Sequence, residues 1–140
     1  MFHTLISKIN TALSEVTSVQ EYYDYPETKI SGYPAVVFFA NDFQNNFDST
    51  AENSKVYNFS IFVLQETKTA TIKTVYKTIM PKVLDDIIAK FDSTWSQGAS
   101  TAGHRIWWTM TGGTWAVVQG QDGEMVQAEL NLQINVNTNL

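Results

Sequence analysis

The sequence has no cysteine, few histidines and few basic residues, and each shortage excludes a class of chemistry. Without cysteine, the chain can form no disulfide, no thiolate nucleophile and no cysteine-based zinc or iron–sulfur centre. Its two histidines, His3 and His104, form no HxxxH or HxH pair and so do not predict a metal site. The nine basic residues are spread along a chain of net charge −5, which argues against binding through nucleic-acid phosphates.

Long apolar segments are also missing. The longest, Ala35 to Ala40, has six residues, whereas a membrane-spanning helix needs about 20. The first residues lack the basic start and the apolar stretch of a signal peptide. We therefore expect a soluble protein.

What the sequence does contain is enough apolar material for a core. Apolar residues make up 44% of the chain and aromatic residues 13%, which excludes an intrinsically disordered chain. A length of 140 residues is typical of one domain. We therefore expect a single domain over residues 1–140.

Apolar residues recur at helical spacing in two segments, residues 2–16 and residues 69–91. Pro81 lies within the second segment, where it removes a backbone hydrogen bond and clashes with the preceding turn. A kink near Thr78 or two abutting helices is therefore predicted.

Strands are predicted where apolar and polar residues alternate or where β-branched and aromatic residues cluster. The mostly polar segment from Asn41 to Lys55 is expected to form a long β-hairpin arm, and residues 92–103 a mobile loop. Gly112-Gly113 and Asp122-Gly123 predict two turns that make the last three strands a meander. The expected fold class is α+β, a mostly antiparallel mixed β-sheet with both helices packed on one face. The predicted strands are residues 21–26, 35–40, 56–64, 104–110, 114–119 and 124–136.

The last predicted strand, Glu124 to Val136, alternates strictly over some eleven residues, about twice the usual strand length. Its apolar residues are expected to cover the helices, and its polar residues to face the other way. A strand of this length needs partners along its whole length, because unpaired backbone groups invite association with other chains. The polar positions are Gln127, Glu129, Asn131, Gln133 and Asn135.

No group of side chains in the sequence is typical of an active site. Asp85 and Asp86 are the closest carboxylate pair, but neighbours on a helix project about 100° apart. There is no GxSxG nucleophile motif, and a strand rather than a helix follows Gly112-Gly113, unlike in a phosphate-binding loop. We therefore expect no enzymatic activity, no cofactor and no metal.

Trp107 and Trp108 are adjacent on a predicted strand and must face opposite sides of the sheet. One is expected in the core, and the other is either exposed or buried by another subunit, because aromatic residues are enriched in interfaces. A pocket wall for a stacked ligand is the alternative role for the tryptophans.

The order of elements resembles that of tail terminator and tail-completion (head–tail joining) proteins of long-tailed bacteriophages. The likeness is best in the segments YPAVVFF and VYNFSIFVLQE, which are separated by an arm of about fifteen residues. It covers most of the chain as a pattern of elements rather than as a sharp motif.

This resemblance implies a non-enzymatic virion protein of the tail or neck, assembled in the host cytoplasm. It would form a ring, usually a hexamer, that caps the head-proximal end of the tail tube and meets the head-side connector protein. DNA would pass through the lumen without specific binding, which an acidic chain would favour. The arm would reach a neighbouring subunit. The residues expected at subunit interfaces are Phe43, Phe47, Asp48, Lys55, Trp107, Trp108, Gln127, Glu129, Asn131 and Gln133.

Two other hypotheses remain open from the sequence. The chain could be another ring protein of the same assembly, either a head-side connector or the tube protein itself. It could instead be a small-ligand-binding α+β domain with a pocket that contains Trp108 or Trp115.

Overall fold

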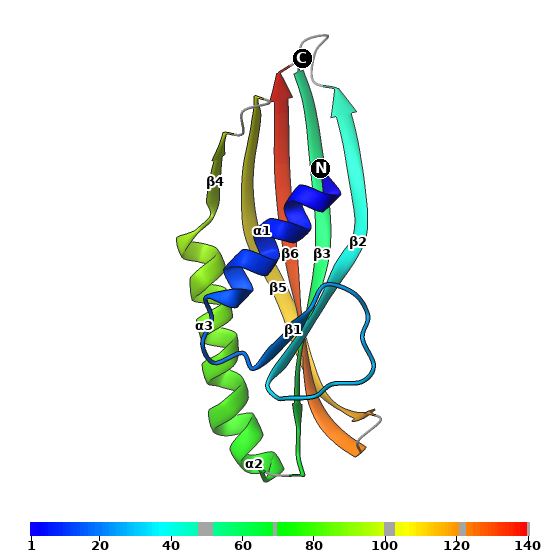
Figure 1. Ribbon diagram of the computed structural model, residues 1–140, viewed down its shortest axis with the longest axis vertical. Coiled ribbons are helices and arrows are strands. Elements are labelled where there is room, and N and C mark those ends of the chain that lie inside the picture. Colours follow the sequence, from blue (N-terminus) through cyan, green and yellow to red (C-terminus); the bar gives the residue numbers. More distant parts are fainter. Residues whose placement is uncertain (48–51, 69, 100–102, 121–122, 140) are drawn as a thin grey trace.

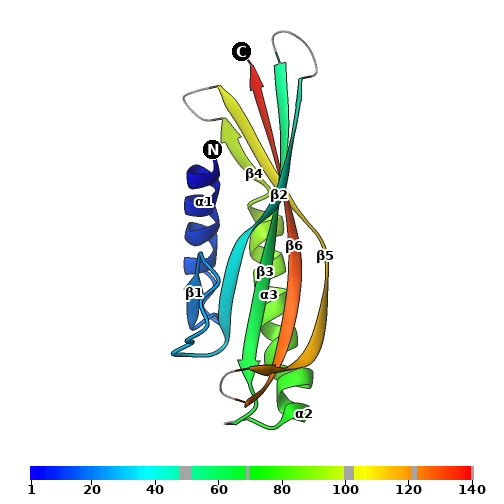
Figure 2. The same cartoon turned by 90° about the vertical axis from the view of Figure 1, so that its right-hand side faces the viewer.

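Long β-strands determine the shape of the molecule, which is elongated along the strand direction (Figures 1 and 2). The computed structural model describes residues 1–47, 52–68, 70–99, 103–120 and 123–139. The described residues form a six-stranded sheet in the order β1-β2-β3-β6-β5-β4. Only β1 and β2 are parallel, so the predicted mostly antiparallel mixed sheet is confirmed. The strands are β1 (Glu21–Tyr23), β2 (Ala35–Phe47), β3 (Glu52–Glu66), β4 (Ser96–Ala99), β5 (His104–Gly120) and β6 (Gly123–Asn139).

The helices pack on one face of this sheet, as predicted (Figure 1). The first is α1 (Phe2–Ser14). The second helical segment consists of α2 (Ile72–Thr74), the π-helical turn η1 (Val75–Ile79) and α3 (Met80–Ser93). Pro81 lies in the first turn of α3, where a missing N–H is tolerated. The irregularity predicted near Thr78 is therefore present, as a π-helical turn just before the proline.

The core lies between the helices and the apolar face of the sheet. Along β6 every second residue from Val126 to Val136 is buried in this core, which confirms the alternation predicted for that strand. Leu5, Ile9 and Leu13 of α1 contribute from one side of the helix layer. The buried residues of the second helical segment are Val75, Met80, Val83, Ile87 and Phe91.

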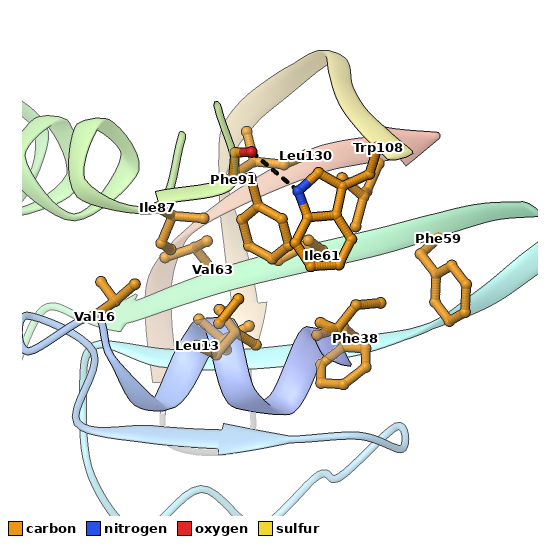
Figure 3. Packing of buried hydrophobic residues seen from close by; sticks show 14 of the residues in the cluster. Leu13, Val16, Phe38, Phe59, Ile61, Val63, Ile87, Phe91, Trp108 and Leu130 are labelled. Atoms are coloured by element: carbon orange, nitrogen blue, oxygen red, sulfur yellow. Dashed lines mark hydrogen bonds between the residues drawn. The ribbon is translucent and has the colours of Figure 1, made fainter. Parts of the chain in front are cut away.

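Trp108 connects the second helix to the sheet (Figure 3). Its side chain is 1% exposed, and its Nε1 donates a 3.0 Å hydrogen bond to the backbone oxygen of Phe91. That oxygen is one of the last carbonyls of α3, which have no partner within the helix itself. The two rings also pack together, with 5.0 Å between their centroids. The indole therefore both fills the core and satisfies the end of α3.

The prediction of a hairpin turn at Gly112-Gly113 is wrong. These glycines lie within β5, which is one strand from His104 to Gly120, and the register shifts between Met110 and Gly112. The bulge lies at Thr111 and Gly112, because Thr111 is the extra residue between the pairs Met110–Leu132 and Gly112–Asn131, and Gly113 follows it. A bulge, like a turn, often requires glycine. At the second predicted turn, Gly120 pairs with Gly123, and Asp122 lies outside the described residues.

Two other segments differ from their predicted structure. The predicted mobile loop at residues 92–103 contains the short strand β4, and its residues 100–102 lie outside the described residues. The predicted arm from Asn41 to Lys55 belongs to the β2–β3 hairpin, with its tip, residues 48–51, outside the described residues. The part of this segment that belongs to β3 lies within the sheet, because β3 pairs with β6 up to the pair Glu52–Asn139.

Replacing the core indole should weaken the whole fold. The substitution Trp108→Phe leaves the Phe91 carbonyl buried without its donor and removes packed volume, so we expect a loss of about 2–3 kcal/mol in unfolding free energy. Trp107→Phe, on the opposite face of the same strand, should cost less than about 1 kcal/mol. Urea denaturation followed by circular dichroism measures both, and equal losses would show that the indole has no special role.

Candidate functional site

The sheet face opposite the helices carries a dense group of amide side chains, which we call the amide face. Residues paired across neighbouring strands point to the same side, and the pairs Asn58–Gln133, Ser60–Asn131 and Trp107–Asn135 place these residues together. No helix of the described residues packs on this side of β3 and β6. The amide face comprises Asp42, Gln44, Asn46, Ser54, Val56, Asn58, Ser60, Arg105, Trp107, Thr109, Asn131, Gln133, Asn135 and Asn137.

The charge of the chain is not concentrated on the amide face. Among its residues only Asp42 and Arg105 are charged, and their charges are opposite. The Asn58 Nδ2 donates a 2.6 Å hydrogen bond to the Asp42 carboxylate, and Asn41 donates to the Ser60 hydroxyl. The face therefore presents neutral groups that both donate and accept hydrogen bonds.

Below the amide face, the same side of the sheet becomes apolar. The rings of Phe39 and Phe62 stack there with 5.6 Å between centroids. A small cleft near them is lined by Pro26, Glu27 and Thr28 of the β1–β2 connection and by Val37, Phe62, Leu64 and Gln127 of the sheet. Part of this side is thus covered by the chain itself, and the amide face is the part that is left open.

The hairpin end presents a second surface, on the helix-bearing side. Phe43 is 54% exposed, and its ring contacts Phe2 and Tyr57 at centroid distances of 5.5 and 6.0 Å. It lies on β2, which has no strand partner on its outer edge beyond Val37 among the described residues. Lys55 of β3 is half-buried on the same side of the sheet. An exposed ring on an open strand edge is a typical element of a contact with another chain.

The residues predicted for subunit interfaces therefore divide into three groups according to their place in the structure. Gln127, Glu129, Asn131, Gln133 and Trp107 lie on the side of the sheet that bears the amide face, whereas Phe43 and Lys55 lie at the hairpin end and point the opposite way. The third group is not available for contact or not described. Trp108 lies in the core of this chain, so of the adjacent pair only Trp107 reaches the surface. Phe47 ends β2, and Asp48 lies outside the described residues.

A cleft lies between α3 and β5, and we call it the α3–β5 cleft. The sequence suggested a pocket with Trp115 only under the small-ligand alternative, and it did not predict the other lining residues. The cleft has a volume of about 390 Å³. The β-bulge helps to form it, because Gly112 has no side chain and a Cβ built there would meet no heavy atom within 4 Å. The sequence prediction placed a turn at Gly112-Gly113, and a strand that ended there would not form the wall of this cleft. Its lining residues are Leu84, Ile88, Asp92, Met110, Thr111, Gly112, Gly113, Thr114, Trp115, Ala128 and Leu130.

The titratable groups with shifted pKa values are spread over the molecule. A hydrogen bond between Tyr25 and Glu27, which lines the small cleft, raises the pKa of the tyrosine and lowers that of the carboxyl. The Asp86 pKa is lowered by hydrogen bonds from Ser18 and from Lys82 of the same helix; the first, 2.8 Å long, joins α3 to the segment after α1. Burial raises the pKa of Tyr57. In the described part of the chain, no three His, Asp or Glu side chains lie close enough together to hold a metal ion.

Comparison with known proteins identifies no family: no protein-family model matches the chain, and no curated protein matches it. Within the described ranges, no helix is both long enough and apolar enough to cross a membrane.

The close approach of Gly113, which follows the bulge, to β6 can be tested by adding a single methyl group. A Cβ on Gly113 would lie 2.3 Å from the backbone oxygen of Glu129, which cannot move without disturbing β6. We expect Gly113→Ala to lower the unfolding free energy by about 2 kcal/mol or more. In Gly32→Ala the new Cβ meets only the flexible side chains of Gln20 and Glu21, so the loss should be smaller. Thermal unfolding of both variants measures the difference, and an unaffected Gly113→Ala would contradict this account of the close approach.

Proposed function

We propose that this chain is a structural virion protein that forms a ring on the head-proximal end of a bacteriophage tail tube. The ring would end polymerisation of the tube and join the tail to the head-side connector. The observation that best supports this proposal is the open amide face, a large, nearly neutral sheet surface without clustered catalytic groups among the described residues.

The arrangement of the two surfaces supports a ring rather than a symmetric dimer. In a head-to-tail contact, one patch of a subunit meets a different patch of the next, and the contact repeats until the ring closes. The amide face and the hairpin end with Phe43 and Lys55 are two such patches, on opposite sides of the sheet. We propose that the hairpin end of each subunit lies against the amide face of its neighbour.

The chemistry of the amide face suits this role. Burying a charge costs far more than burying an amide that finds a hydrogen-bonding partner. A face with seven amides and only two charged residues can therefore be covered by a neighbouring chain at low cost. Its open parts would also bind DNA phosphates weakly, because they carry no cluster of basic residues.

The same surfaces also suit a related ring protein of the tail or neck, either a head-side connector or the tube protein. A tube protein stacks its rings into long tubes, whereas a terminator forms single rings. Electron microscopy of the purified protein distinguishes these two behaviours. The small-ligand hypothesis is favoured by one different observation, the α3–β5 cleft with Trp115 in its wall.

The oligomer can be tested by native mass spectrometry. We expect a species of six times the 15.8 kDa chain mass, and single rings by electron microscopy. Asn131→Arg should abolish this species, because it would bury an unpaired charge on the amide face.

A matched control places the same charge elsewhere. Ala89→Arg adds an arginine at an exposed position of α3, away from both proposed patches, and should leave the oligomer intact. A monomeric mass at every concentration, or an oligomer that survives Asn131→Arg, would contradict the proposal.

A further inference from the structure

The α3–β5 cleft lies apart from both surfaces proposed for the ring. It opens on the helix-bearing side, between Leu84 and Ile88 of α3 and the bulged part of β5, with Ala128 and Leu130 of β6 also in its lining. None of the residues assigned above to the amide face or the hairpin end lines it. Whatever binds there can therefore be tested independently of the ring.

The opening follows from the sequence around it. On α3, Leu84, Ile88 and Asp92 are spaced by four residues and so lie along one stripe of the helix, which lines the cleft. On β5, a Cβ built on Gly112 has no heavy atom within 4 Å, so that part of the strand leaves empty space. Helix and strand thus leave a gap at the bulge.

The walls of the cleft are mainly apolar. Leu84, Ile88, Met110 and Leu130 supply aliphatic surface. Trp115 supplies aromatic surface. Its side chain is 41% exposed, and its ring packs against the ring of Tyr76 with 5.2 Å between centroids. A cavity of about 150 Å³ is enough for benzene, so a volume of about 390 Å³ accommodates one aromatic ring with a short chain attached.

The polar lining of the cleft selects the charge of its ligand. Asp92 contributes a carboxylate, Thr111 contributes a hydroxyl that donates to the backbone oxygen of Asn131, and no lysine or arginine lines the cleft. An anionic ligand would meet a negative charge there, in a chain that is already acidic overall. A cationic group beside Asp92 would gain an ion pair while its apolar part fills the remaining space.

We propose that the α3–β5 cleft binds a cation attached to an aromatic group. This chemistry occurs in small arylalkylamines, and also where an aromatic and a basic side chain adjoin in another protein. Trp115 and the aliphatic residues hold the ring, and Asp92 selects the positive charge.

The test uses the full-length protein and two probes, one for each source of this chemistry. The first is 2-phenylethylammonium, and the second is the capped dipeptide N-acetyl-phenylalanyl-lysinamide. Binding is followed through the tryptophan indole N–H signals in two-dimensional NMR, with the signal of Trp115 identified by its loss in Trp115→Phe. We expect at least one probe to shift the Trp115 signal with a saturable, millimolar dissociation constant. The probe with the lower dissociation constant indicates whether a small amine or side chains of another protein supply this chemistry.

Two matched variants test the role of the carboxylate. Asp92→Asn should weaken binding of the cationic probe about two- to fivefold, as expected for loss of a solvent-exposed ion pair. Asp85→Asn removes the same charge from an exposed position of α3 outside the cleft and should leave binding unchanged. The neutral isostere 2-phenylethanol should bind wild type and Asp92→Asn equally.

The proposal is overturned if neither probe shifts the Trp115 signal, or if Asp85→Asn weakens binding as much as Asp92→Asn. Neither result would affect the ring proposal, whose readout is the oligomeric mass.

Discussion

Burial of one face of the long sheet against two helices is the interaction on which the rest of the structure depends. The apolar residues of β6 and β3 that face α1 and α3 form a continuous core, with Trp108 and Phe91 joining the sheet to the second helix. Because side chains alternate along a strand, fixing the apolar residues on one side fixes every intervening residue on the other. The amide face is therefore a direct consequence of the core.

The bulge in β5 connects this architecture to the second site. A regular strand would place every second side chain on the side of α3, and the sheet would pack closely against the helix along its whole length. Instead, Gly112 and Gly113 let β5 continue to Gly120 while the backbone of β6 approaches closely at Glu129. The same two glycines thus give β6 a partner along its whole length and leave a cleft near Trp115.

The sequence predicted the parts of the fold that depend on local periodicity. The alternation in β6, the helical spacing in α1 and the disturbance before Pro81 each follow from interactions between residues close in the chain, and each is present. Adjacent tryptophans had to face opposite ways, and Trp107 and Trp108 do so. Which of the two is buried was decided by packing against Phe91, which no local pattern encodes.

The parts that local patterns could not predict depend on distant contacts. Gly112-Gly113 satisfies the rules for a turn as well as those for a bulge, and only pairing with β6 distinguishes them. The polar residues after Ala40 continue β2 within the β2–β3 hairpin, and the pairing of the β3 part of this segment with β6 depends on a contact distant in sequence. The α3–β5 cleft depends on the bulge in β5 and on the packing of α3 against the sheet. Neither contact can be predicted from local sequence patterns.

The central claim is that a neighbouring subunit covers the amide face, and spin labelling tests it most directly. Because the chain has no cysteine, Gln133→Cys gives a single labelling site in the middle of that face. The account predicts an immobilised label in the oligomer, with dipolar coupling to labels on other subunits. A label on the amide face that moves freely in solution and shows no coupling between subunits would contradict it.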